Sequence, residues 1–130
     1  MAMIKAETSK GEYFTQVKLS DTMLDASNSP GLNDLFESLF REGEKNLILS
    51  MSEVVQCSDD GLKTLQAGHE MASSRNGSFV LCCLNAAVEN LLKTVPAEPA
   101  LHIVPSLEEA VDLVLFNEIE NQLRAESGED

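Results

Sequence analysis

Two adjacent carboxylates are the side chains in this sequence that most suggest chemistry. Asp59 and Asp60 occur in the segment "CSDDG", residues 57–61, which follows an apolar run and precedes a helical pattern. Paired carboxylates can hold Mg²⁺ or accept a phosphoryl group when further acidic ligands and a lysine lie at neighbouring strand ends. Such carboxylates also stabilise a helix N-terminus, because its unpaired amides and partial positive charge favour negative side chains.

The other reactive residues do not complete a catalytic or metal site. The segments "FVLCCLN" and "LHIVPS" carry neither an acidic ligand nor a lysine at their ends. His69 and His102 have no neighbouring cysteine or serine in a nucleophilic pattern, and the aspartates beside Cys57 oppose formation of its thiolate. No CxxC, glycine-rich phosphate loop or HxxxH pair is present. We therefore expect no catalytic residue, no metal and no cofactor.

The composition predicts one acidic α/β domain. The chain has 130 residues, of which 22 are acidic and 9 basic, and its formal net charge is -13. This charge disfavours nucleic acids and anionic membranes as partners. No apolar stretch approaches the length of a membrane span or a signal peptide, so we expect a cytoplasmic protein. We assign residues 1–120 to the domain and 121–130 to an acidic tail that includes the end of the last helix.

The first half of the chain predicts a hairpin, a helix, a strand and a second helix. "MIKAE" and "EYFTQVKL" flank a Ser-Lys-Gly turn, and Tyr13, Thr15, Val17 and Leu19 alternate onto one face. The first helix is expected to be capped by Asn28 or Ser29 and to end at Gly43. "NLILSM" reads as a strand buried on both faces. The second helix is predicted from Ser58 to about Asn76, with Ser58 or Asp59 as its cap and Gly77 ending it.

The second half of the chain predicts two strands alternating with two helices. "SFVLCCL" is expected to be a buried strand that places Cys82 and Cys83 on opposite faces. A helix capped by Asn85 should turn Val88, Leu91, Leu92 and Val95 to one side, and "LHIV" is the last strand. Ser106 and Glu109 form a capping box for a helix whose inward positions include Val111, Val114, Leu115 and Leu123. The order β, β, α, β, α, β, α, β, α predicts a mixed, mostly parallel sheet of four or five strands, covered mainly on one side by four helices.

These segments together resemble the STAS domain, whose best-known members are bacterial anti-sigma factor antagonists. The resemblance spans residues 2–118 and is carried by the opening hairpin, "SDTMLDASNSPGLNDLFESLF", "NLILSMSEVVQCSDDGLKTL", "GSFVLCCLNAAVENLL" and "PSLEEAV". The family reads Asp-Ser-Ser-Gly-Leu at the start of the second helix, and its second serine is phosphorylated by an anti-sigma kinase. Aligning Gly61 with that glycine puts Asp60 at the phosphoacceptor serine and Ser58 at the motif's aspartate. Asp25 falls at a loop aspartate common in the family, whereas Ser50 replaces another.

The resemblance implies a non-catalytic module that binds a partner protein. The partner would be an anti-sigma factor or a serine kinase of the histidine-kinase-like ATPase class. The implied surface comprises Asp25, Ser58, Asp59, Asp60 and Gly61, extended along the helix by Lys63, Thr64 and Ala67. Asp60 supplies about half of the charge that a phosphate would add.

Several alternatives stay open. Asp60 fits a permanent phosphorylated-like state, a partner that tolerates or favours a carboxylate, or a domain that is regulated elsewhere or not at all. Ser58 is a candidate substitute acceptor, although a serine at that position also serves as a helix cap. The module would also suit an accessory subunit of a transporter or ABC ATPase. An aspartyl-phosphate receiver or enzyme using Asp59 and Asp60 is the alternative of another class.

Overall fold

A five-stranded mixed sheet forms the centre of the protein. The computed structural model describes residues 4–94 and 101–126. The strands, in spatial order, are β1 (Ala6–Lys10), β2 (Thr15–Leu19), β4 (Leu47–Ser50), β6 (Phe79–Cys82) and β7 (His102–Val104). Strand β1 pairs antiparallel with β2, and the other neighbouring pairs are parallel. The predicted α/β class, opening hairpin and mostly parallel sheet are therefore confirmed.

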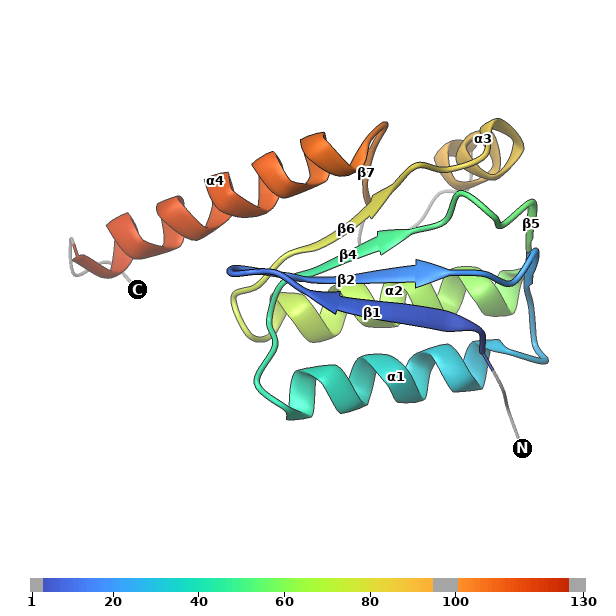
Figure 1. Cartoon of the computed structure of the whole chain (residues 1–130), viewed down its shortest axis with the longest axis horizontal. Helices are drawn as coiled ribbons and strands as arrows, with labels where there is room; N and C mark the ends of the chain where they lie inside the picture. Colours follow the sequence, from blue (N-terminus) through green and yellow to red (C-terminus); the bar gives the residue numbers. More distant parts are fainter. Residues whose placement is uncertain (1–3, 95–100, 127–130) are drawn as a thin grey trace.

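Helices cover both faces of this sheet, although unequally. The described residues contain four helices: α1 (Ser29–Arg41), α2 (Asp59–Ser73), α3 (Ala86–Thr94) and α4 (Leu107–Glu126). Helices α1 and α2 lie on one face, whereas α4 lies on the other and continues past the end of the strands (Figure 1). None of the helices in the described ranges combines the length and apolarity needed to cross a membrane.

The central strand β4 is buried on both faces, as its unbroken apolar sequence predicts. Leu47 and Leu49 belong to the main core beneath α1 and α2, where Phe36 and Leu65 are also buried. Ile48 points to the opposite face, into a smaller core that contains Val80, Cys82, Ala110 and Val114. A strand with helices on both sides has no polar face, which explains why "LILS" does not alternate.

Two short strands form a second sheet that the sequence patterns do not predict. Strand β3 (Met23–Leu24) pairs in parallel with β5 (Gln56–Cys57), with Met23 opposite Gln56 and Leu24 opposite Cys57. Two residues are too few to show an alternating pattern, so the predicted order of elements lacks both strands. This pair joins the loop before α1 to the loop before α2.

The opening turn and two apolar side chains differ from the prediction. Lys10 belongs to β1, and the turn follows it, closed by a 2.7 Å hydrogen bond from the Gly11 N–H to the Phe14 carbonyl. Thr15, Val17 and Leu19 are buried as predicted, whereas Tyr13 precedes β2 and is exposed. Leu123 is also exposed, because the end of α4 lies beyond the strands on which it would pack.

The prediction that Cys82 and Cys83 point to opposite faces is wrong. Strand β6 ends at Cys82, and Cys83 adopts a left-handed backbone conformation with φ of 63°. Strict alternation therefore stops at Cys82. As a result, the two Sγ atoms lie 3.3 Å apart at the end of the strand.

The predicted helix ends are close to those observed. Asn28 occupies the N-cap position of α1, but its side chain makes no cap hydrogen bond. Helix α2 ends at Ser73, a few residues before the predicted Asn76, which has φ of 58°. The Asn85 side chain caps α3, and Ser106 accepts the Glu109 N–H at 3.2 Å. Val95 lies outside the described residues, as does the end of the acidic tail, residues 127–130.

Helix α2 packs very closely on the sheet at Gly68. The rings of Phe36 and Phe79 meet edge to face, with centroids 5.2 Å apart. A Cβ atom on Gly68 would lie 2.7 Å from Phe79 Cε1 and 2.9 Å from Phe36 Cε2. Both rings are fully buried, so neither has room to move away.

We predict that Gly68→Ala lowers the free energy of unfolding by about 1–2 kcal/mol, because overpacking against two fixed rings costs about 2–3 kcal/mol and the gain in helix propensity offsets about 1 kcal/mol of it. Urea unfolding followed by circular dichroism measures the change. Glu70→Ala, at an exposed position of the same helix, is the control and should shift stability by no more than about 0.5 kcal/mol. An unchanged or increased stability of Gly68→Ala would mean that α2 packs less closely than described.

Candidate functional site

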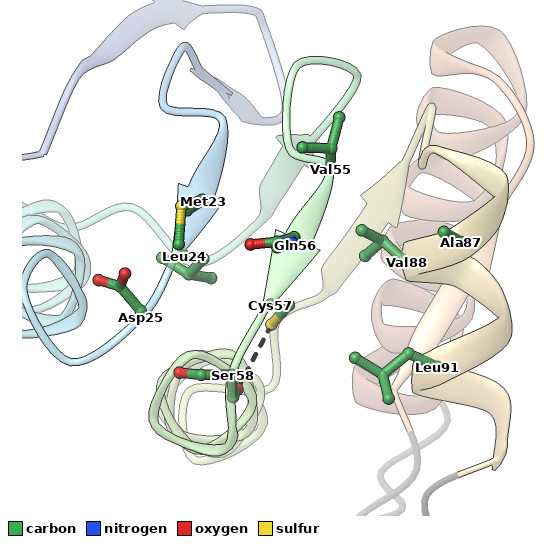
Figure 2. Close-up of a pocket in the computed structure, with 10 residues that line it drawn as sticks. All are labelled: Met23, Leu24, Asp25, Val55, Gln56, Cys57, Ser58, Ala87, Val88 and Leu91. Atoms are coloured by element: carbon green, nitrogen blue, oxygen red, sulfur yellow. Dashed lines mark hydrogen bonds between the residues drawn. The ribbon is translucent and has the colours of Figure 1, made fainter.

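An open apolar hollow lies where β3, β5, the start of α2 and α3 meet. Its volume is about 470 Å³. Figure 2 shows Val88 and Leu91 of α3 facing Cys57 and Ser58 across this space, with Met23, Leu24 and Asp25 on the far side of β5. The hollow is lined by Met23, Leu24, Asp25, Val55, Gln56, Cys57, Ser58, Ala87, Val88 and Leu91.

The walls of the hollow expose apolar side chains to solvent. Met23, Val55 and Leu91 retain 44%, 48% and 41% of their accessible surface. Val88 and Leu91 both line the hollow, which agrees with their predicted placement on one side of α3, although Leu91 is exposed and Val88 is buried. Three exposed apolar residues around one concave surface are typical of a protein or ligand contact.

The start of α2 forms one edge of the hollow. Ser58 is the N-cap, as predicted, and its Oγ accepts the Gly61 N–H at 3.4 Å. Asp59 and Asp60 follow in the first turn, and both are exposed. Gly61 is buried, and a Cβ atom there would lie 2.7 Å from the carbonyl oxygen of Leu24. The glycine of "CSDDG" therefore lets the helix approach β3.

Asp25 is held in place by its own loop. Its Oδ1 accepts hydrogen bonds from the Ser27 hydroxyl at 2.6 Å and the Ser27 N–H at 2.9 Å. These bonds lower the pKa of Asp25 below its ordinary value, against a smaller opposing effect of desolvation. The Asn28 side chain accepts the Asp25 N–H and donates to the Met23 carbonyl, which explains why it does not cap α1.

Asp60 faces a second, shallower hollow on the other side of the helix start. This hollow has a volume of about 300 Å³ and lies between the N-termini of α1 and α2. Its lining comprises Ala26, Ser29, Pro30, Asn33, Asp60, Lys63 and Thr64. The predicted site residues are thus divided: Asp25 and Ser58 line the apolar hollow, whereas Asp60, Lys63 and Thr64 line the smaller one.

The predicted contact residues along α2 differ in exposure. Lys63 is exposed and Ala67 is half-buried. Thr64 is buried, as is Gly61, so both shape the surface more than they present side chains to a partner. Ser50, at the other substituted family position, is buried at the end of β4.

Cys57 is a poor nucleophile in this structure. Burial raises the pKa of its thiol to about 11, with a further contribution from the negative charge of Asp59. Its Sγ lies 3.6 Å from the Ser58 carbonyl oxygen, to which the thiol donates (Figure 2). The positive end of the helix dipole favours the thiolate, but it does not outweigh burial and the charge of Asp59 in setting the pKa of Cys57.

The side chains of His69 and His102 lie close together outside the two hollows described above, and sequence reasoning did not predict this contact. His69 of α2 and His102 of β7 place their ring centroids 5.6 Å apart. Burial lowers the pKa of His69, and the charge of His102 lowers it further, while Glu70 opposes both. Within residues 4–94 and 101–126, no three His, Cys, Asp or Glu side chains converge as metal ligands.

Sequence reasoning also missed most of the apolar lining of the main hollow. Met23, Val55 and Gln56 belong to the short β3 and β5 region, and no periodic pattern identifies them. The available signal is the pair of apolar residues in "TML" and "EVV", placed directly before the loops that lead into α1 and α2. Apolar residues before a polar loop are too common to identify a surface without the structure.

The comparisons with known proteins agree on one family and one fold. The family model described as STAS domain matches residues 5–110. An anti-sigma factor antagonist from Mycobacterium paratuberculosis superposes with a TM-score of 0.75 at 18% identity, over 87% of this chain and 95% of that protein. The phosphorylated cell fate determinant SpoIIAA of Bacillus gives a TM-score of 0.63 at 13% identity, over 86% and 99%.

A membrane transporter contains a similar fold. The murine anion transporter Solute Carrier 26 family member A9 superposes with a TM-score of 0.65 at 21% identity, over 85% of this chain and 18% of the transporter. Comparison of the sequence with curated proteins finds no match. At these identities, the structural similarities establish the fold.

We predict that Cys57 reacts slowly with iodoacetamide and that its rate rises about tenfold per pH unit between about pH 8 and 10, because its thiolate forms only near pH 11. Mass spectrometry of a Cys82→Ser, Cys83→Ser background isolates this thiol. Asp59→Asn should raise the rate by less than about tenfold, since burial remains the larger cause. A rate that levels off near the ordinary thiol pKa would contradict the burial described here.

Proposed function

The chain belongs to the STAS domain family, and on this basis we propose that it is a non-catalytic protein-interaction module similar to an anti-sigma factor antagonist. Its partner is an anti-sigma factor or a serine kinase of the histidine-kinase-like ATPase class. The module works in the cytoplasm of a bacterium. The proposed domain occupies residues 1–120, and the acidic tail begins at Asn121, whose side chain donates to the Asn76 carbonyl at 2.8 Å.

The observation that carries this proposal is the position of the apolar hollow. It lies beside the helix start at which the family carries its phosphoacceptor, and Asp25 and Ser58 line it together with the exposed Met23, Val55 and Leu91. An apolar recess with a polar rim suits an apolar anchor residue of a partner protein. The proposed contact surface comprises Asp25, Ser58, Asp59, Asp60, Gly61, Lys63, Thr64 and Ala67, with the hollow beside it.

Asp60 gives this surface a permanent negative charge. Its carboxylate is exposed in the first turn of α2, where the helix dipole stabilises it. A phosphorylated serine there would carry about -1.5 to -2 charges and three acceptor oxygens, so the carboxylate reproduces about half of the charge. We propose that the partner tolerates this fixed charge and that its binding does not depend on phosphorylation of the module.

We predict that Val55→Ser weakens binding to the cognate partner by about tenfold, because a buried valine side chain contributes about 1.5 kcal/mol or more. Isothermal titration calorimetry with the anti-sigma factor or serine kinase encoded beside the gene measures the change. Val55 is exposed in the free protein, so the substitution should leave stability unchanged. Phe116→Ser, also exposed but on α4, is the control and should bind normally. Equal affinities for both variants and the wild type would exclude the hollow as the contact.

We predict that Asp60→Ser becomes a substrate of the partner when that partner is a serine kinase, because the substitution restores a hydroxyl at the family's acceptor position. Mass spectrometry after incubation with the kinase and ATP detects the phosphate. Asp60→Ala is the control and should not be phosphorylated. Failure of a kinase that binds the module to modify Asp60→Ser would contradict the proposed alignment of this site.

Three further experiments separate the remaining alternatives. Phosphorylation of the wild type that disappears in Ser58→Ala would identify Ser58 as a substitute acceptor. Phosphorylation of Asp59 or Asp60 by acetyl phosphate and Mg²⁺ would overturn the non-catalytic module in favour of a receiver. The fold similarity to the murine anion transporter favours a second candidate function, an accessory subunit of a transporter. Co-purification with a membrane transporter or ABC ATPase, in place of an anti-sigma factor or kinase, would support it.

A further inference from the structure

An exposed apolar stripe runs along the outer face of α4, away from the proposed partner site. Phe116, Ile119 and Leu123 retain 59%, 57% and 59% of their accessible surface. Their spacing of three and four residues places all three side chains on one face of the helix. Single exposed apolar residues are ordinary, whereas a continuous stripe on a helix typically marks a contact with another protein.

Polar contacts on the opposite face keep this stripe turned outward. The Asn117 side chain donates to Ser78 Oγ at 3.0 Å. Glu118 pairs with Lys45 at 3.1 Å and accepts a hydrogen bond from the Asn46 side chain at 3.2 Å. Together with the contact of Asn121, these bonds attach the second half of α4 to the loops beside β4 and β6. Burying the stripe against the sheet would require breaking them.

The α4 stripe lies on the part of the helix that extends beyond the sheet. The first half of α4 buries Ala110 and Val114 against the sheet, but the second half extends past the ends of the strands (Figure 1). Helix α4 has 20 residues and is about 30 Å long. The stripe, from Phe116 to Leu123, extends over about two of its turns. The hollow of the proposed function lies at the opposite end of the sheet, beside β5 and α3.

The residues bordering the stripe carry negative charge. Asp112 lies one turn before Phe116 on the same face, and Glu120 follows Ile119; both are exposed. The sequence of α4 has six acidic residues, Glu108, Glu109, Asp112, Glu118, Glu120 and Glu126, and one basic residue, Arg124. A matching surface must therefore combine apolar residues with positive charge.

We propose that the α4 stripe is a docking site for a cationic amphipathic helix of another protein. Leucine-like side chains of that helix would cover Phe116, Ile119 and Leu123, while its lysines or arginines would face Asp112 and Glu120. A second copy of this chain is a worse match, because it would bring two acidic borders together on molecules that each carry a net charge of -13. The same charge disfavours an anionic membrane surface.

A synthetic Leu/Lys peptide of about 18 residues, with leucine at helical spacing, tests the proposal by fluorescence anisotropy at about 0.15 M salt. The full chain should bind it, and Phe116→Gln or Ile119→Gln should weaken binding by about tenfold or more. The double substitution Asp112→Lys and Glu120→Lys should also weaken binding of the Leu/Lys peptide. It should favour a matched peptide in which glutamate replaces every lysine. Val55→Ser, in the other surface, is the control and should bind normally, so this test is independent of the proposed function. Circular dichroism confirms that each variant keeps its helices.

Three outcomes would overturn the proposal. Equal binding of a Leu/Lys peptide with scrambled order would show simple charge attraction. Sedimentation as a dimer that Ile119→Gln converts to a monomer would assign the stripe to a second copy of the chain. Binding to vesicles of phosphatidylcholine and phosphatidylglycerol that is lost in Ile119→Gln would assign it to a membrane surface.

Discussion

The carbonyl oxygen of Leu24 meets the first turn of α2, and the geometry of the candidate site depends on this contact. The oxygen accepts the Ser58 N–H at 2.9 Å, and Gly61 packs against it without a side chain. The contact fixes the start of α2 beside β3, which in turn places Asp25 and Ser58 in one hollow. A larger residue at position 61 would separate the helix from β3 and enlarge the gap between the two loops.

A second close contact, at Gly68, continues the same constraint along α2. The helix lies directly on the Phe36 and Phe79 rings, so it has little freedom to slide or rotate. Rigid packing of α2 explains how the protein can present two exposed carboxylates, Asp59 and Asp60, at a fixed position. The helix dipole stabilises these charges locally, and the Ser58 cap holds the first turn that carries them.

The fold places exposed acidic residues beside two separate groups of exposed apolar side chains. One acidic surface surrounds the start of α2, and another borders the α4 stripe at the other end of the sheet. Both combine carboxylates with exposed apolar side chains, which is the composition expected of surfaces that bind proteins of opposite charge. We therefore propose a rigid module with two separated contact surfaces, of which the family resemblance accounts for one.

Sequence patterns predicted the parts of the fold that depend on neighbouring residues. The helices α1 and α2 follow from apolar periodicity, and the caps at Ser58, Asn85 and Ser106 follow from short motifs that act within one turn. The unbroken apolar run of β4 correctly indicated burial on both faces. The assignment of Asp60 to the family's phosphoacceptor position rests on residue type and alignment alone, and it stays a prediction.

The tertiary structure alone decided how these parts meet. The β3 and β5 pair is stabilised by contacts between segments about thirty residues apart, and each strand is too short to leave a pattern. The exposure of Leu123 depends on where the sheet ends, and the meeting of Cys82 with Cys83 depends on a single left-handed residue. The sequence by itself therefore determined the four helices, the five strands of the main sheet with their order, and the resemblance to the family. The hollow and the α4 stripe required the structure, because both arise between elements that are distant in sequence.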